Sequence, residues 1–130
     1  MKYRQPSSQE LYAWAQKGRT SEERFRHLLS DPAKKPSWIS KVEHSNRQDD
    51  YDKGIDFYVF TTTGWKIPVD VKSSMWGFRK HVAKRGAFDI CLIVVDSNID
   101  DDAMRSKIVD FIARFQEKVI RRGKESLFKQ

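Results

Sequence analysis

Residues 55–72 have the sequence IDFYVFTTTGWKIPVDVK, and this stretch decides the fold. Apolar residues alternate with other residues on both sides of Thr62-Thr63-Gly64, which is typical of two β-strands that each bury one face. The three-residue link suits a hairpin loop with Gly64 in the left-handed conformation. The stretch therefore predicts an antiparallel β-hairpin.

The register of this hairpin follows if Thr61 faces Trp65 across the loop. The odd-numbered apolar residues of the two strands then face one another and make one face continuously apolar. On the other face Asp56 lies opposite Asp70. A slip of one residue would destroy both patterns, so the register is well determined.

Two carboxylates and a lysine meet on the polar face in this register. Lys72 lies two residues after Asp70 and so points to the same side, opposite Gly54, which leaves open space. Facing carboxylates, with Cβ atoms roughly 4.5–5.5 Å apart, repel each other unless a cation neutralises them. Carboxylate oxygens suit hard divalent cations, so we expect a metal site around Asp56 and Asp70. The simpler alternative for Asp70 and Lys72 is a surface ion pair, contributing about 0–1 kcal/mol.

The segment before the hairpin predicts two short helices and a strand. Capping-box spacings begin at Ser7 and Thr20. The first helix is expected to end near Gly18 and the second at Pro32. Residues 38–42 then form a first strand.

Glu22 is an acid on an apolar helical stripe, because Phe25 and Leu29 follow at spacings of three and seven. Two interpretations stay open: stabilisation by the helix dipole in a first turn, or a role beside the metal. Glu23 is the alternative acid, although its capping-box position assigns it a local structural role.

The second half of the chain predicts a basic crossover, a buried strand over residues 88–95 and a helix from Asn98 to about Arg121. The acidic first turn of that helix, Asp100-Asp101-Asp102, is explained by the helix dipole. The complete order predicts a single α/β domain over residues 1–130, with a mixed central sheet of about four strands flanked by helices. The tail, residues 122–130, is either a flexible end or a basic extension that adds affinity.

Composition favours a soluble protein that meets nucleic acid. The 25 Lys and Arg residues exceed the 18 Asp and Glu residues, giving a net charge of +7, which suits a phosphate backbone. A basic protein without such a partner is the alternative. No signal peptide or membrane-spanning run is evident, so we expect a cytoplasmic protein without membrane contact. Cys91, the only cysteine, excludes an intramolecular disulfide and is expected to be a buried core thiol.

These features resemble the PD-(D/E)xK phosphodiesterase superfamily, whose restriction-endonuclease-like fold includes restriction enzymes and Holliday junction resolvases. The matching pieces are residues 18–29 with Glu22, then Gly54-Ile55-Asp56, then residues 69–73 with Asp70 and Lys72. The resemblance implies a restriction-endonuclease-like core and a divalent-metal-dependent endonuclease that hydrolyses phosphodiester bonds, with DNA as the favoured substrate. The chain departs from the pattern because no proline precedes Asp56 and the second acid is Asp rather than the commoner Glu.

The resemblance also implies roles for individual residues. Asp56 and Asp70 would ligate Mg²⁺ or Mn²⁺, with the carbonyl of Val71 as a further ligand. Lys72 would orient or deprotonate the attacking water, and Glu22 would complete the catalytic set. An alternative function is a non-catalytic module that keeps the nuclease fold and binds nucleic acid or a protein partner.

A basic segment with interspersed aromatic residues follows Lys72 and is a candidate nucleic-acid surface. The residues expected to contact the nucleic acid are Ser73, Trp76, Arg79, Lys80, His81, Lys84 and Arg85. The alternative is a solvated basic helix face. A homodimer is a further expectation, because it would let two sites act on two strands.

Overall fold

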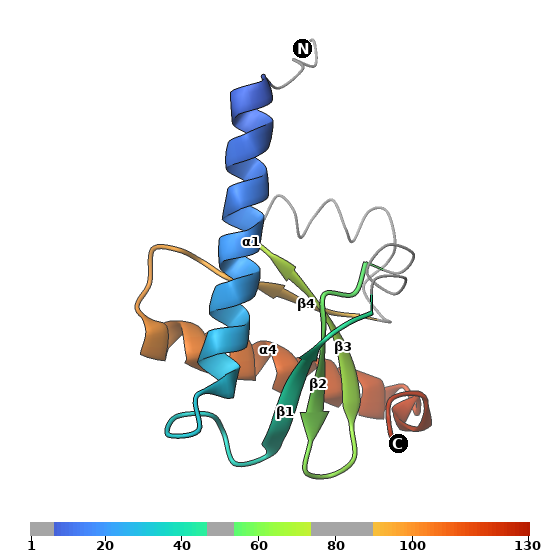
Figure 1. The fold of residues 1–130 in the computed structure, drawn as a ribbon. Coiled ribbons are helices and arrows are strands. Elements are labelled where there is room, and N and C mark those ends of the chain that lie inside the picture. The colour runs from blue at the N-terminus through green and yellow to red at the C-terminus, as the bar shows by residue number, and fades with distance from the viewer. Residues whose placement is uncertain (1–6, 47–53, 74–89) are drawn as a thin grey trace.

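The computed structural model describes residues 7–46, 54–73 and 90–130. These ranges contain two long helices, four strands and a short 3₁₀ helix (Figure 1), namely α1 (Ser8–Ser30), β1 (Ile39–His44), β2 (Phe57–Thr61), β3 (Lys66–Lys72), β4 (Cys91–Val94), α4 (Asp101–Arg121) and η1 (Glu125–Leu127). The strands form one sheet in the order β1-β2-β3-β4. Strands β1, β2 and β3 are antiparallel neighbours, while β4 pairs parallel to β3. The predicted α/β class and mixed four-stranded sheet are confirmed.

The hairpin has the predicted register. Phe57 pairs with Val69 and Phe60 with Lys66, which is the alignment expected from the sequence. Gly64 has a φ of +90°, a left-handed conformation that glycine adopts without the steric cost of a Cβ atom. The loop prediction is therefore confirmed together with the register.

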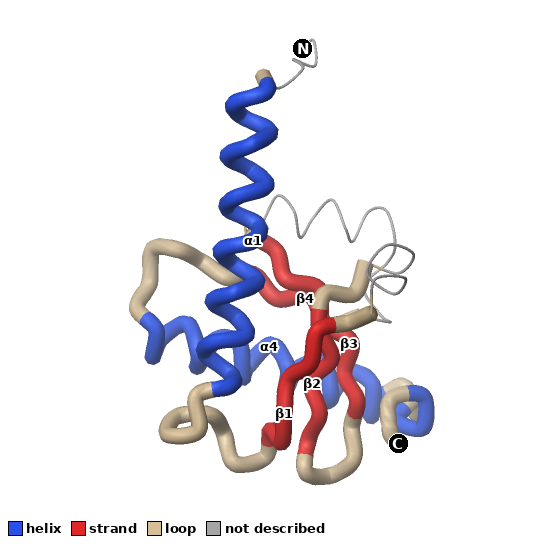
Figure 2. The backbone as a smooth tube through the Cα atoms, in the orientation of Figure 1, coloured by secondary structure: helices blue, strands red, loops and turns tan. Residues whose placement is uncertain are grey.

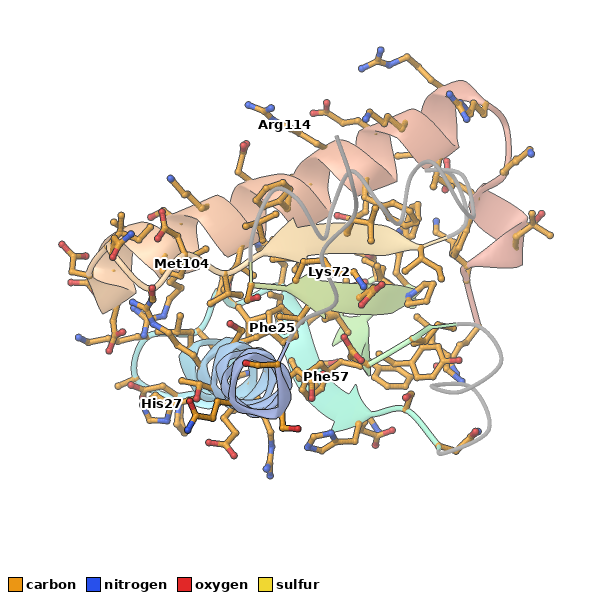
Figure 3. All side chains as sticks on the ribbon, turned by 90° about the horizontal axis from the view of Figure 1, so that it is seen from above. Phe25, His27, Phe57, Lys72, Met104 and Arg114 are labelled. Atoms are coloured by element: carbon orange, nitrogen blue, oxygen red, sulfur yellow. The ribbon has the colours of Figure 1, made fainter. Side chains whose placement is uncertain are left out.

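One face of the sheet carries the hydrophobic core and both long helices. The buried strand residues of this core stand at odd-numbered positions, and they are Ile39, Phe57, Val59, Ile67, Val69, Val71, Cys91 and Ile93. Helix α1 adds Phe25, Leu28 and Leu29, and α4 adds Met104, Ile108, Ile112, Phe115 and Val119. Figure 3, which looks along α1, shows Phe25 beside Phe57, whose ring centroid lies 5.1 Å away. The alternating apolar residues of the strands and the apolar stripe of α4 therefore pack into one core.

Helix α1 corrects the prediction of two short helices. It continues without a break from Ser8 to Ser30, through Gly18 and Thr20. Good helix formers flank the glycine, and a glycine inside a helix costs only about 0.5–1 kcal/mol. Thr20 therefore begins no helix, and Glu23 lies in the helix interior rather than in a capping box. The N-terminal part of α1 extends away from the sheet (Figure 1).

The C-terminal half of α1 is fixed against α4, which it crosses in the view of Figure 2. The Arg24 guanidinium donates to the carbonyls of Asp96 and Ile99 at 2.5 and 2.6 Å and pairs with Asp101 at 3.0 Å. From α4, Arg105 donates to the carbonyl of Leu28 at 2.9 Å. Because these contacts surround Arg24, they also fix the turn of α1 that carries Glu22.

The other predicted elements are present with shifted ends. The first strand covers residues 39–44 rather than 38–42, and β4 is shorter than the predicted strand over 88–95. Asp100 caps α4 by accepting a 2.8 Å hydrogen bond from the N–H of Ala103, and Asp101 and Asp102 occupy the first turn. The acidic run therefore belongs to the helix start, as predicted.

The last three residues pack against the hairpin. The carbonyl of Phe128 accepts a 2.7 Å hydrogen bond from the N–H of Lys66, and the N–H of Gln130 donates to the carbonyl of Gly64. The Phe128 ring meets Phe115 edge to face at 5.4 Å. The structure thus gives residues 122–130 defined contacts where a flexible tail was one expectation.

Cys91 is a buried residue of β4, as predicted, and burial raises the pKa of its thiol to about 12. Among the described residues, no helix has the length and apolar character needed to cross a membrane.

Candidate active site

The β2 ladder changes at Asp56, the residue directly before β2. The N–H of Asp56 donates to the carbonyl of Val69 at 2.8 Å, although Val69 already faces Phe57. Two consecutive residues therefore oppose one residue of β3, which is the arrangement of a β-bulge. Bulges redirect side chains and are frequent beside active sites. The predicted register thus holds to Phe57, and Asp56 itself lies outside the regular pairing.

The redirected side chain of Asp56 binds the backbone of β3. Its Oδ2 atom accepts a hydrogen bond of 2.8 Å from the N–H of Val71. On the other side of the bulge, the N–H of Ser45 donates to the carbonyl of Asp56 at 3.0 Å. Asp56 is therefore held by the strand on each side of it and has a fixed place between β1 and β3.

The carboxyl groups of Asp56 and Asp70 are in hydrogen-bond contact, so the two acids meet as predicted despite the bulge. Burial, this hydrogen bond and the charge of Asp70 together raise the pKa of Asp56 to about 9. The N–H of Val71 opposes this shift, because it stabilises the ionised form. A hydrogen bond between two carboxyls needs a proton on one of them, and the raised pKa of Asp56 indicates that the pair holds one proton near neutral pH.

Lys72 lies beside this pair. Its Nζ atom is 3.1 Å from Oδ2 of Asp70. The Asp70 side chain is only 5% exposed and that of Lys72 is 29% exposed, so the ion pair is not the solvated surface contact that was the simpler alternative. The acid and the base of the Asp70-Val71-Lys72 sequence lie on one face of β3, as predicted.

Glu22 reaches the same site from α1. It lies in the helix interior, so stabilisation by the dipole in a first turn does not explain it. Its charge is close enough to contribute to the raised pKa of Asp56. Glu23, the alternative acid, is exposed. The structure therefore brings Asp56, Asp70 and Lys72 together, places Glu22 within electrostatic range of Asp56, and leaves Glu23 exposed.

A pocket of about 460 Å³ adjoins the site at Glu22. Its other lining residues come from α1 and the end of β1, and they are Glu23, Arg26, His27, Ser30 and His44. No signal in the sequence indicates this pocket, because it forms only where α1 packs against the end of β1.

The acidic residues are the available oxygen ligands for a metal. Within residues 7–46, 54–73 and 90–130, no group of three or more His, Cys, Asp or Glu side chains is arranged to hold a metal ion. The donor set is instead the carboxyl pair Asp56 and Asp70. Such a pair fits Mg²⁺, which usually keeps several water ligands and is bound through one or two carboxylates. It also fits because replacing the shared proton by a cation relieves the repulsion between the two acids.

Most of the predicted nucleic-acid surface lies outside the described residues. This applies to Trp76, Arg79, Lys80, His81, Lys84 and Arg85. Ser73 is described and is half-buried directly after β3. The strands on either side of this segment, β3 and β4, pair in parallel.

Comparison of the chain with protein-family models, with curated proteins and with solved structures found no match.

Proposed function

We propose that this chain is a divalent-metal-dependent nuclease of the PD-(D/E)xK type that hydrolyses phosphodiester bonds, with DNA as its substrate. The observation that carries the proposal is the carboxyl pair of Asp56 and Asp70 with Lys72 at 3.1 Å from Asp70. Two acids with a shared proton are costly to hold together in a partly buried place, and a divalent cation is the partner that makes such a pair favourable.

The order of the elements supports a restriction-endonuclease-like core. An acid-bearing helix comes first, followed by three antiparallel strands and then by a parallel strand after the crossover. In this arrangement Asp56 enters at the start of the second strand and Asp70 with Lys72 at the end of the third. This is the placement that the resemblance to the PD-(D/E)xK superfamily implies.

Asp56 and Asp70 would hold Mg²⁺ or Mn²⁺, and the carbonyl of Val71 would be a further ligand. The metal, when bound, would supply Lewis acidity to a phosphoryl oxygen and lower the pKa of a coordinated water. The hydrogen bond from the N–H of Val71 keeps the Asp56 carboxylate in position for this role. Ionisation of Asp56 then completes the charge that the cation requires.

Lys72 would act on the attacking water and on the phosphate. Its ammonium group is held by Asp70 and so does not have to be ordered when the substrate binds. A fixed positive group offsets the negative charge that grows on the phosphoryl oxygens in the transition state. Glu22 would hold a water molecule at the edge of the site, and its carboxylate would make the total charge of the site more negative.

The net charge of +7 supports a polyanionic substrate, since basic proteins gain affinity for phosphate backbones through the release of counterions. The pocket beside Glu22 gives space for part of such a substrate. Two copies of the chain, acting as a homodimer, would cut both strands of a duplex or a junction.

The test is cleavage of labelled DNA by the wild-type protein in Mg²⁺ or Mn²⁺ and in chelator. Single-stranded, duplex, flap and four-way-junction DNA of one sequence, with RNA as a further substrate, would identify the preferred structure. Cutting that requires the metal supports the proposal. Binding of these substrates without cutting in either metal would instead make the chain a non-catalytic module with the same fold.

A further inference from the structure

The face of the sheet opposite the core carries a row of aromatic and basic side chains. Lys41 of β1 pairs with Phe60 of β2, which in turn pairs with Lys66 of β3. Tyr58 lies two residues before Phe60 on the same strand and therefore on the same face. This aromatic-lysine row, defined as Lys41, Tyr58, Phe60 and Lys66, spans three strands.

The lysines of the row lie over the aromatic rings. Nζ of Lys41 is 4.7 Å from the centre of the Phe60 ring, and Nζ of Lys66 is 4.4 Å from the centre of the Tyr58 ring. Lys66 also approaches Phe60 at 5.9 Å. Tyr58, Phe60 and Lys66 are half-buried and Lys41 is exposed. Rings and cations therefore alternate across the row, at distances typical of cation–π contacts.

The row is on the same face of the sheet as Asp70 and Lys72. Lys66, Asp70 and Lys72 are even-numbered residues of one regular strand, so their side chains point to the same side of the sheet. The distance along β3 from Lys66 to Lys72 is about 20 Å at the usual rise per residue.

The chemistry of the row favours one kind of ligand. Flat aromatic rings stack on nucleobases, and lysines beside them bind the phosphates that connect those bases. Bases in a duplex are already stacked on one another and cannot lie on the rings, whereas unpaired bases can. Glu43, which pairs with Lys41 at 2.9 Å, is the acidic residue at the edge of the row. A lysine over a half-buried ring at the surface is weakly held, so a base can displace it toward the neighbouring phosphate.

We propose that the aromatic-lysine row binds a single-stranded polynucleotide on the face of the sheet that also carries Asp70 and Lys72. This inference rests on the proposed nuclease function for its class of substrate, while the binding itself can be measured without cleavage. It adds to the proposed function a preference for substrates with an unpaired strand, such as single strands, flaps or open junctions.

The test is the binding of fluorescently labelled single-stranded DNA of about 12 nucleotides, measured by anisotropy in chelator so that no cleavage occurs. The same sequence as a duplex and as single-stranded RNA provides the comparison. We expect the single strands to bind more tightly than the duplex. Replacing both rings, Tyr58→Leu with Phe60→Leu, should weaken single-strand binding by about five- to a hundredfold and leave duplex binding nearly unchanged.

Matched variants separate stacking from stability and from charge. Phe111→Leu makes the same substitution on α4, at a half-buried residue packed on the core, and should leave binding unchanged. Phe60→Trp keeps a ring that can stack on a base and should therefore preserve binding. It serves as the second variant in case Phe60→Leu destabilises the fold. Lys66→Gln should weaken binding more than Lys107→Gln, which removes the same charge from an exposed position on α4.

Equal binding of duplex and single strand, or equal effects of the row variants and their α4 controls, would overturn this inference. A protein that binds single strands through the row and cuts nothing would retain the inference and contradict the proposed nuclease. If the wild type cuts DNA but the double variant Tyr58→Leu, Phe60→Leu binds single strands as tightly as the wild type, the nuclease proposal is retained and this inference is contradicted.

Discussion

The N–H of Val71 donates a 2.8 Å hydrogen bond to the carboxylate of Asp56. In a regular hairpin that N–H would donate to a carbonyl of the neighbouring strand, and the bulge at Asp56 makes the side chain take its place. One hydrogen bond thus ends the β2 ladder and fixes the carboxylate against Asp70. The bulge at Asp56 is therefore part of the candidate active site.

The pH dependence of stability is the first prediction. The pKa of Asp56 is raised from about 3.8 to about 9 in the folded protein, so between these values the folded state binds one more proton than the unfolded state. The free energy of unfolding should therefore decrease as pH rises, by up to about 1.4 kcal/mol per pH unit from this group. This contribution is complete below the unfolded pKa and is lost as pH rises through the folded pKa. Urea unfolding in chelator, measured over this pH range, checks it.

The matched variant for this prediction is Asp56→Asn, which has the same shape and no titrating proton. Other groups also titrate, so the informative quantity is the difference in unfolding free energy between wild type and variant at each pH. That difference should move in favour of the asparagine variant as pH rises. Parallel profiles for the two proteins would show that Asp56 has an ordinary pKa.

Binding of a divalent metal should stabilise the folded protein. At a pH near 8, Mg²⁺ or Mn²⁺ should raise the melting temperature of the wild type by several degrees, since a ligand at a hundred times its Kd adds about 2.7 kcal/mol. Asp70→Asn removes half of the carboxyl pair and should abolish most of this shift. Asp110→Asn, at an exposed residue of α4 paired with Arg114, should retain it. A shift of equal size in all three proteins would indicate nonspecific metal binding.

Glu22 and Glu23 offer a comparison of adjacent residues. The charge of Glu22 contributes to the raised pKa of Asp56, so Glu22→Gln should lower that pKa. Glu23→Gln changes the same charge at an exposed neighbouring position and should have little effect. Carbon NMR of the side-chain carboxyls, followed through a pH titration, measures the pKa directly. Equal shifts in the two variants would mean that Glu22 does not face the carboxyl pair.

Gly64 tests the hairpin loop. Its φ of +90° disfavours residues with a Cβ atom, but the nearest atom to an added Cβ would be a backbone oxygen of Gln130 at 3.8 Å, an ordinary contact. Gly64→Ala should therefore cost about 1–2 kcal/mol through the backbone conformation alone. Gly64→Asn should cost less, because asparagine tolerates left-handed conformations. Urea unfolding of both variants measures these costs, and equal losses would point to packing instead.

The hairpin could be predicted from the sequence because its signals are local and agree with one another. A period of two, a glycine in the loop and a continuous apolar face together permit one register, and residues 57–60 adopt it. The same holds for α4, where the helical period and the acidic start of the helix agree. That Asp70 and Lys72 share a face followed from their spacing of two along the strand.

The features that sequence did not predict depend on the tertiary structure or on competing local signals. Two capping-box spacings and Gly18 indicated a break in the first helix, but the helix-forming residues around them continue as α1. The bulge at Asp56 and the pocket between α1 and β1 have no local signature. The bulge depends on the bond between the Asp56 side chain and the β3 backbone, and the pocket depends on how α1 packs against the sheet.

The most direct test of the proposed function is the rate at which wild type and Lys72→Ala cut one labelled DNA substrate in Mn²⁺, with Lys107→Ala as the charge control. The wild type and Lys107→Ala should cut at similar rates, and chelator should stop both. Lys72→Ala should fold normally and cut at least about a hundredfold more slowly, because it lacks the fixed positive group at the reacting phosphate. Cutting by Lys72→Ala at the wild-type rate, or cutting that continues in chelator, would contradict the assignment of Asp56, Asp70 and Lys72 as the active centre.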